Sequence, residues 1–235
     1  MKKDSVAIIT ARGGSKRIPR KNIKPFLGIP IIKYSIDAAL RSGCFDEVMV
    51  STDDKEIAEI AAAYGATIPF FRSAETSNDH ADTVSVLKEV ILEYRDRGLD
   101  FTYLCGIYPT APFITARKLQ EAMSKLKESG AGSVLPVTRF SYPIQRALKI
   151  ENGRVMMIHP ENYFARSQDL MPTYHDCGQF YCMRTDAMFR ESKYCMDHTV
   201  PYELPEVEVQ DIDNNEDWEL AEIKYQYLKN KGVIG

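Results

Sequence analysis

The sequence is poor in the features that mark secreted and membrane proteins. Its five cysteines form no CxxC pair, and no apolar run approaches the roughly 20 residues of a membrane span. The early apolar stretch 6–9 is too short for a secretion signal. We therefore expect neither a disulfide framework nor a zinc site, and we favour a cytoplasmic protein that has no membrane partner.

The chain also has no excess of positive charge. The 235 residues carry a net charge of −3, which argues against a general nucleic-acid partner. The hydrophobic content of 44% and the charged content of 27% are ordinary for a globular protein. The length suits one large domain, so we expect residues 1–235 to form a single unit.

Apolar periodicity alternates between strand-like and helix-like segments along the first part of the chain. Segments whose apolar residues have helical spacing begin at a capping Asp, such as Asp54 or Asp82, or end at a Gly. Strands are expected at 6–9, 47–51, 101–107 and 131–137, and helices at 31–40, 54–64, 82–97 and 115–128. This alternation predicts an α/β fold in which helices cover both faces of a mostly parallel sheet.

The rhythm changes after Thr138. Two short strands, 147–151 and 155–159, flank Asn152-Gly153, which is a favoured hairpin turn. We interpret residues 139–175 as an arm inserted into the domain. The pattern then predicts strands at 178–183 and 206–212 and a last helix that begins at Asn214 or Asn215.

A basic loop that contains no acid follows the first strand. Six cations lie between Arg12 and Lys24, and Gly13 and Gly14 let the backbone bring its N–H groups close to a ligand. A guanidinium can hold phosphate oxygens bidentately, while Lys16 and Lys21 are mobile point charges. The loop is neither a Walker A motif nor GxGxxG. It predicts a small polyanion, although a solvated basic loop is the alternative.

Two aspartates near the end of the chain are the acidic counterpart of this loop. On the expected strand, Asp211 and Asp213 would point to one face, because side chains alternate along a strand. Such a pair can hold Mg²⁺ together with substrate phosphate. Alternatively, one aspartate caps the following helix and the other is solvated. Asp176 is a weaker acidic candidate.

The basic loop resembles the opening motif of the cytidylyltransferases that activate acidic nonulosonic sugars, the CMP-sialic acid synthetases and their relatives. The pattern A-R-G-G-S-K-x-x-x-x-K-N matches from Ala11 to Asn22. The resemblance implies a Rossmann-like, GT-A-like nucleotidyltransferase fold, CTP as co-substrate and Mg²⁺ on Asp211 and Asp213. It further implies catalytic roles for Arg12, Lys21 and Asp211, and nucleotide binding by Arg12, Gly13, Gly14, Ser15, Lys16, Lys21, Asn22 and the Arg72 of "FRSAE".

The same resemblance suggests where the sugar binds. Tyr108 in "YPTAP" replaces a glutamine that is usual in CMP-sialic acid synthetases, and Arg166 would meet the sugar carboxylate. The stretch "TYHDCGQFY" is similar to the pseudaminic acid branch, in which Gln179 and Tyr181 would line the pocket. Core packing is the alternative role for these two residues. We expect His175 to have a structural role rather than to contact the substrate.

The function expected from this resemblance is transfer of CMP from CTP to the anomeric hydroxyl of an acidic nine-carbon sugar, with release of pyrophosphate. Pseudaminic acid is favoured, and sialic and legionaminic acid are rivals. The arm would exchange between subunits of a homodimer. A Kdo cytidylyltransferase, a guanylyltransferase for a cofactor and a non-catalytic nucleotide sensor remain as alternatives.

Overall fold

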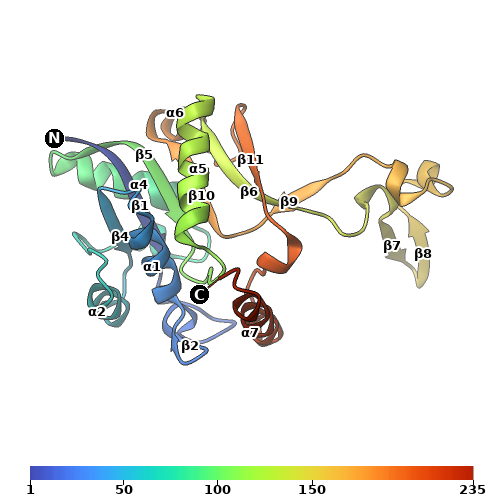
Figure 1. Cartoon of the computed structure of the whole chain (residues 1–235), viewed down its shortest axis with the longest axis horizontal. Helices are drawn as coiled ribbons and strands as arrows, with labels where there is room; N and C mark the ends of the chain where they lie inside the picture. Colours follow the sequence, from blue (N-terminus) through green and yellow to red (C-terminus); the bar gives the residue numbers. More distant parts are fainter. Residues whose placement is uncertain (235) are drawn as a thin grey trace.

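A seven-stranded sheet forms the centre of the protein, whose computed structural model describes residues 1–234 (Figure 1). The strand order is β11-β6-β10-β5-β1-β4, and β9 also pairs with β6. Only β10 and β9 run antiparallel to the others, so the expected mostly parallel sheet is confirmed. The strands are β1 (Lys2–Thr10), β4 (Glu47–Ser51), β5 (Asp100–Ile107), β6 (Ser133–Arg139), β9 (Tyr174–Asp176), β10 (Phe180–Arg184) and β11 (Thr199–Glu203).

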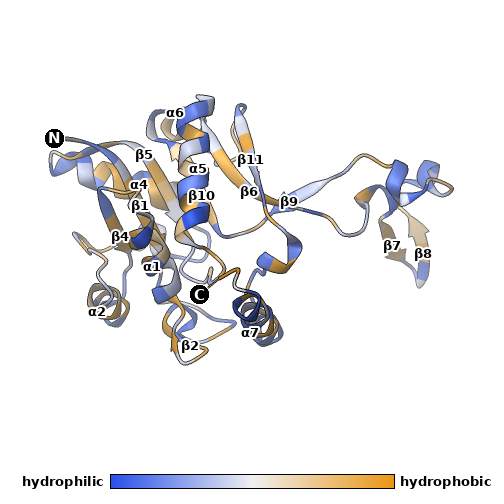
Figure 2. Cartoon of the chain, in the orientation of Figure 1, coloured by the Kyte–Doolittle hydropathy of each residue, from blue (hydrophilic) through white to orange (hydrophobic). Residues whose placement is uncertain are grey.

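Helices cover both faces of the sheet because alternate residues of β1 are buried on opposite sides. Ala7 and Ile9 pack with α1 (Ile32–Ser42), α2 (Lys55–Ala63) and α5 (Ala116–Ser129). On the other face, Val6 and Ile8 pack with the remaining sheet-covering helices, α4 (Thr83–Asp96) and α6 (Thr185–Glu191). Figure 2 shows the apolar residues concentrated along the central strands. The predicted two-sided α/β architecture is therefore confirmed.

The predicted helix starts coincide with side-chain caps. Asp54, Asp82 and Thr115 each accept a hydrogen bond from a backbone N–H in the first turn of the helix that follows. Asn214 and Asp217 form a reciprocal capping box at the start of α7 (Asn215–Asn230). These caps satisfy backbone donors that a helix terminus would otherwise leave free, which is why local sequence located these helices well.

A small third cluster joins the two ends of the chain. α7 buries Trp218 and Ala221 against Phe26 and Ile31, and the ring of Trp218 meets Phe26 edge-on at 5.6 Å. Phe26 belongs to a two-stranded ribbon formed by β2 (Pro25–Phe26) and β3 (Ile29–Pro30). This packing brings the segment before α7 next to the loop after β1.

The predicted strand at 206–212 is wrong. Pro205 instead starts a 3₁₀ turn, η5 (Glu206–Glu208), and the chain then runs without regular structure to α7. The sheet edge is formed by β11. Its Pro201 has no backbone N–H to donate, which is tolerated because an edge strand pairs on one side only. Asp211 and Asp213 consequently lie on a loop and not on a strand.

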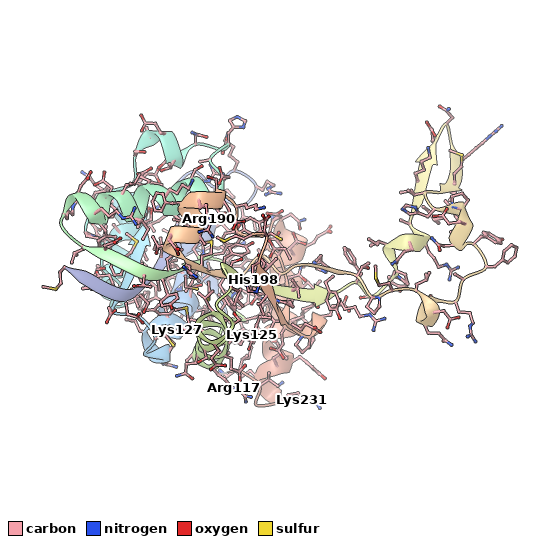
Figure 3. All side chains as sticks on the ribbon, turned by 90° about the horizontal axis from the view of Figure 1, so that it is seen from above. Arg117, Lys125, Lys127, Arg190, His198 and Lys231 are labelled. Carbon is pink, nitrogen blue, oxygen red and sulfur yellow. The ribbon has the colours of Figure 1, made fainter. Side chains whose placement is uncertain are left out.

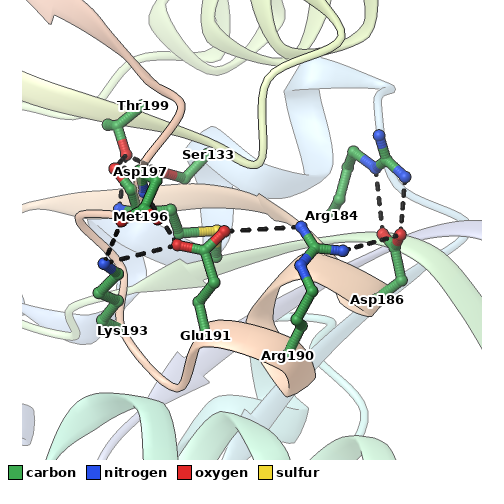
Figure 4. Close-up of polar contacts among 9 residues, drawn as sticks. All are labelled: Ser133, Arg184, Asp186, Arg190, Glu191, Lys193, Met196, Asp197 and Thr199. Atoms are coloured by element: carbon green, nitrogen blue, oxygen red, sulfur yellow. Dashed lines mark hydrogen bonds and ion pairs between the residues drawn. The ribbon is translucent and has the colours of Figure 1, made fainter.

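Polar contacts fix the turn that leads into β11 (Figure 4). The Met196 N–H donates to Thr199 Oγ1 at 2.6 Å, and the hydroxyls of Thr199 and Ser133 lie 2.7 Å apart. Lys193 and Asp197 pair within the same turn at 2.6 Å. The contact between Ser133 and Thr199 joins residues 66 positions apart, so local sequence pattern did not indicate the strand.

An arm projects from the body between β6 and β9 (Figures 1 and 3). Its tip is an antiparallel hairpin, β7 (Leu148–Glu151) and β8 (Arg154–Met157). Asn152 and Gly153 have φ of 52° and 72°, the left-handed values that a two-residue hairpin turn needs. The base is closed where Arg139 pairs with Tyr174. The remaining short helices are η1 (Lys21–Ile23), α3 (Ala74–Ser77), η2 (Ile144–Arg146), η3 (Pro160–Asn162) and η4 (Ser167–Asp169).

Basic side chains on the body lie against partners from the same domain. Of the residues labelled in Figure 3, Arg117 pairs with Glu121 at 2.7 Å and Lys127 with Asp4 at 2.7 Å. Lys125 donates to the carbonyl oxygen of Pro201 at 2.7 Å and so connects α5 to β11. Within residues 1–234, no helix has both the length and the apolar character that a membrane span requires.

Candidate active site

The basic loop lies at the edge of the sheet where parallel strands end. Thr10 pairs with Ser51, and Ile9 with Ile107, so β1, β4 and β5 finish side by side. This edge is where open α/β sheets bind ligands. Asp53, at the end of β4, accepts from the N–H of Gly13 at 2.8 Å.

Glycine is required at the first of the two loop glycines. A Cβ at Gly13 would lie 2.8 Å from Asp54 Oδ2, which is closer than side-chain contacts allow. By contrast, nothing lies within 4 Å of a Cβ added to Gly14. Gly13 therefore lets the loop approach α2 closely, while neither glycine is among the residues that line the cavity described next.

A cavity of about 320 Å³ opens beside this loop. It brings together residues from the start, middle and end of the chain. Most of the nucleotide and metal candidates line it: Arg12, Ser15, Lys16, Lys21, Asn22, Arg72, Asp211 and Asp213. The loop at 77–83, after α3, contributes Asn78, Ala81 and Thr83.

The two ends of the chain meet at Lys21. Its Nζ donates to the carbonyl oxygen of Ile212 at 2.6 Å and lies 3.9 Å from Asp213 Oδ1. Arg17 pairs with Asp213 at 2.7 Å. Burial lowers the pKa of Lys21, whereas burial and the nearby Asp213 raise the pKa of Asp211. The basic loop and the carboxylates thus face one another across a single cavity.

The carboxylate pair has the chemistry of a magnesium site that substrate completes. Burial first, and the charge of Asp213 second, raise the pKa of Asp211, and a divalent cation beside the pair would offset both effects. The part of the chain that the structure describes has no cluster of three or more His, Cys, Asp or Glu ligands. Mg²⁺ tolerates such a partial protein shell because it keeps water and takes phosphate oxygens.

Arg12 and Lys16 already hold an anion, the carboxylate of Asp79. Arg12 Nη1 lies 2.6 Å from Asp79 Oδ1, and Lys16 donates to the other oxygen. Hydrogen bonds from Lys16 and Arg12 hold the pKa of Asp79 at about 2. Asn22 steadies Arg12 by donating to its carbonyl oxygen at 2.8 Å. A phosphate that binds these cations would compete with Asp79 for them or use their remaining N–H donors.

Arg72 is a buried cation in the cavity wall. Its Nε donates to Ser51 Oγ at 2.9 Å and its Nη2 to the Ser51 carbonyl oxygen at 2.5 Å. Burial lowers its pKa to about 10, which leaves it charged at neutral pH. These two bonds fix the guanidinium at the end of β4, ready to contact a ligand in the cavity.

A second cavity of about 450 Å³ adjoins the first. Tyr108 and Asp211 line both cavities, so they mark the boundary between them. Its other lining residues include Thr138, His175, Asp176, Gly178, Tyr181, Tyr194, Glu206, Gln210 and Lys224. A molecule in the second cavity would approach a nucleotide in the first beside Asp211.

Aromatic rings and one carboxylate shape the second cavity. Tyr181 Oη donates to Asp176 Oδ2 at 2.6 Å, and its ring stacks on Tyr194 with centroids 4.4 Å apart. Tyr108 meets Tyr181 edge-on at 5.6 Å, and its hydroxyl lies 2.9 Å from Thr83 Oγ1. Burial raises the pKa of Tyr181, so the phenol stays a neutral hydrogen-bond donor. Tyr181 lines this cavity, but it is buried in the second core cluster and its hydroxyl is already bonded to Asp176, so its contact with the sugar stays a prediction.

Gln179 does not lie where the sequence predicted. It is buried, and its Nε2 donates to the carbonyl oxygen of Glu208 at 2.8 Å. It precedes β10 and is not among the lining residues of either cavity. Gln179 therefore packs against the segment that leads to Asp211, which is the role that the sequence left open as the alternative to a sugar contact.

Arg166 lies on the arm and lines neither cavity of its own chain. Its guanidinium pairs with Asp169 through contacts of 2.7 and 3.1 Å and remains largely exposed. The structure therefore does not bring Arg166 to the site within one chain. His175 does line the second cavity, with its Nδ1 2.9 Å from the carbonyl oxygen of Asp176.

Several site residues were missed by sequence reasoning. Asp53, Tyr194 and Lys224 carry no local motif, and each reaches the site through the tertiary fold. A signal existed for Asp53, because a polar residue just beyond the end of a buried strand lies at the ligand edge of an α/β sheet.

Two solved structures share this fold. CMP:2-keto-3-deoxy-manno-octonic acid synthetase complexed with CTP superposes with a TM-score of 0.68 at 17% identity, covering 97% of this chain and 100% of that one. The 4-diphosphocytidyl-2C-methyl-D-erythritol synthase of Anaerococcus prevotii gives 0.65 at 15% identity, over 95% and 99% of the two chains. The fold is that of a Rossmann-like nucleotidyltransferase.

Sequence comparison establishes the family of the chain. The model of the cytidylyltransferase family matches residues 6–210, and the chain belongs to this family of enzymes. Pseudaminic acid cytidylyltransferase of Campylobacter jejuni serotype O:2 is 43% identical over 94% of this chain and 96% of its own. CMP-N,N'-diacetyllegionaminic acid synthase of Legionella pneumophila is 31% identical over 97% and 99%, and N-acylneuraminate cytidylyltransferase A of Danio rerio is 34% identical over 92% and 49%.

Proposed function

We propose that this cytidylyltransferase transfers CMP from CTP to the anomeric hydroxyl of pseudaminic acid and releases pyrophosphate. The observation that carries the proposal is the convergence of Lys21 with Asp213 and the Ile212 carbonyl, 2.6 to 3.9 Å apart, in the first of two adjoining cavities. One cavity has the cations for a triphosphate, and the other is closed by aromatic and polar groups suited to a sugar.

Catalysis in this proposal is mainly positioning and electrostatics. Arg12, Lys16 and Lys21 bind the triphosphate and stabilise the charge that develops on the departing pyrophosphate. The sugar hydroxyl forms a new bond to the α-phosphorus as the bond to pyrophosphate breaks. Tyr108 and Asp211, at the boundary of the cavities, set where the two substrates meet.

Mg²⁺ is the proposed cofactor. Asp211 and Asp213 would hold it with phosphate oxygens, and it would offset their mutual repulsion and the charge of the triphosphate. The raised pKa of Asp211 supports this assignment, since an adjacent cation favours the ionised carboxylate.

The choice of pseudaminic acid rests on two features. All three sequence relatives named above have an acidic sugar in their names, and the one at 43% identity is a pseudaminic acid cytidylyltransferase. In addition, Tyr108 lies at the boundary of the sugar cavity. Its aromatic ring favours contact with a less polar face of the sugar than a glutamine amide would.

We further propose a homodimer in which the arm exchanges between subunits. The arm exposes large apolar side chains, which solvent rarely surrounds in such number without a partner: Tyr142, Leu148, Ile150, Val155, Tyr163, Phe164 and Met171. In such a dimer, Arg166 could reach the sugar cavity of the other subunit, which would reconcile its predicted role with its position on the arm.

The test is release of pyrophosphate from CTP and Mg²⁺ with a panel of sugar acids: pseudaminic, legionaminic and N-acetylneuraminic acid and Kdo. We expect pseudaminic acid to give the highest kcat/KM, and CTP to be preferred over GTP, ATP and UTP. Turnover of N-acetylneuraminic acid with pseudaminic acid inert would refute the substrate assignment. Binding of CTP with no turnover of any sugar acid would instead indicate a nucleotide sensor.

A further inference from the structure

Lys224 brings a cation into the second cavity from the middle of α7. Its Nζ donates to the carbonyl oxygen of Val209 at 2.8 Å and to Gln210 Oε1 at 3.1 Å. Both acceptors are neutral, and an ammonium has three N–H donors. Lys224 is thus held at the cavity wall by two bonds and keeps a further donor for a ligand.

The charges around this cavity are otherwise acidic or titratable. Asp176, Glu206 and Asp211 are carboxylates, and His175 is an imidazole. Among the described residues that line the cavity, Lys224 is the one lysine or arginine; burial lowers its pKa, and the nearby Glu206 acts in the opposite direction. Asp176 is already occupied by the Tyr181 hydroxyl and the Gly178 N–H. The negatively charged group of a ligand in this cavity should therefore lie beside Lys224.

The chemistry of the sugar specifies where that place must be. In a nonulosonic acid the anomeric carbon carries both the reacting hydroxyl and the carboxylate. Since the hydroxyl has to reach the α-phosphorus beside Asp211, the carboxylate comes to lie next to the same boundary between the cavities. Val209 and Gln210, which hold Lys224, directly precede Asp211 in the chain.

We propose that Lys224 binds the carboxylate of the sugar acid and so selects acidic sugars from within its own chain. The inference rests on the function proposed above and makes that function more specific. Lys224 would make the same kind of contact as predicted for Arg166, but it needs no second subunit to reach the cavity. A charge-assisted hydrogen bond between an ammonium and a carboxylate would orient the anomeric hydroxyl toward the nucleotide.

The test is steady-state kinetics of Lys224→Gln, Lys224→Met and Lys224→Arg on the sugar acid that the wild type turns over best. The matched control is Lys229→Gln, an exposed lysine of the same helix that lines neither cavity. Loss of the charge should raise KM for the sugar about ten- to a hundredfold. KM for CTP should stay within about twofold, and Lys224→Arg should keep most of the sugar affinity.

Two outcomes would overturn the proposal. If KM for CTP rises in parallel with KM for the sugar, Lys224 only tethers the segment that ends at Asp211. If neither changes, it has no part in sugar binding. Lys224→Met keeps the aliphatic stem, so it provides a second measurement of KM for the sugar if Lys224→Gln folds poorly. A wild type that is inert with every nonulosonic acid would instead refute the proposed function itself.

Discussion

Tyr108 joins the two cavities through one hydroxyl and one ring. Tyr108→Phe removes the 2.9 Å contact with Thr83 Oγ1 and keeps the ring against Tyr181. We expect kcat/KM to fall about fivefold, the effect of one neutral hydrogen bond. Tyr108→Ala should cost far more, because it removes the wall between the two substrates.

Steady-state kinetics with each substrate varied in turn would measure both changes. Tyr227→Phe, an exposed tyrosine of α7, is the control. If Tyr108→Ala kept wild-type kinetics, the boundary between the cavities would have no role in the reaction.

Asp54 should make folding stability depend on acidity. It caps α2, and Arg20 Nη1 lies 2.5 Å from its Oδ2, which lowers its pKa. A lowered folded-state pKa adds stability above the unfolded value of about 3.9, and that stability disappears as pH falls through the folded value. Asp54→Asn keeps the cap but loses the charge. We expect a loss of about 0.5–1 kcal/mol at pH 7 that shrinks below about pH 4.

Urea unfolding of both proteins at neutral and acid pH would check this prediction. Asp169→Asn, on the exposed arm, is the matched control. A difference between wild type and Asp54→Asn that is the same at both pH values would mean that the charge of Asp54 is not involved.

At the level of single residues, a contiguous motif carries most of what sequence could predict. Arg12, Lys16, Lys21 and Asn22 fall within one loop, and all four line the first cavity. Lys224 could not be found in this way, because it reaches the second cavity through the packing of α7 against the loop before it. The position of Gln179 behind the cavity likewise depends on tertiary contacts.

The arm is the element whose removal should change assembly and leave the fold intact. Its two ends are already joined, since the Phe140 N–H donates to the Thr173 carbonyl oxygen at 3.0 Å and β6 pairs with β9. Replacing residues 142–171 with a short Gly/Ser linker should therefore preserve the thermal midpoint of the body. If the proposed dimer is right, the particle mass should halve.

Light scattering and thermal unfolding of this deletion would measure both quantities. Ile150→Glu, a single change at an exposed apolar position of β7, is a milder variant that should also weaken the dimer. A wild type that is monomeric at high concentration would contradict the arm's proposed role.

Helices and strands were predicted well where local side chains fix their ends, and poorly where pairing with a distant strand fixes them. Helices that begin at Asp54, Asp82 and Thr115 have side-chain caps that the sequence displays. The alternating apolar residues at 206–212 resemble a strand, yet Pro205 starts a 3₁₀ turn there and β11 occupies the edge. Strand pairing is a choice between distant segments, so a one-dimensional pattern did not settle it.

For the whole molecule, the main consequence of the fold is that its two ends form one site. The loop after β1 and the segment before α7 lie 191 positions apart, yet Lys21 donates directly to Ile212. The third hydrophobic cluster holds them together through Phe26, Ile212 and Trp218. The site therefore exists only in the folded chain, and a ligand that bridges its two sides should stabilise the whole domain.

Calorimetric titration of CTP in the presence of Mg²⁺ tests this account most directly, with wild type, Lys21→Met, Asp211→Asn and the control Lys24→Met, whose cation lies over Trp218. The account predicts that Lys21→Met and Asp211→Asn each weaken CTP binding by about tenfold or more, while Lys24→Met binds normally. It also predicts that omitting Mg²⁺ reduces wild-type affinity to that of Asp211→Asn. Wild-type affinity in both site variants would contradict it.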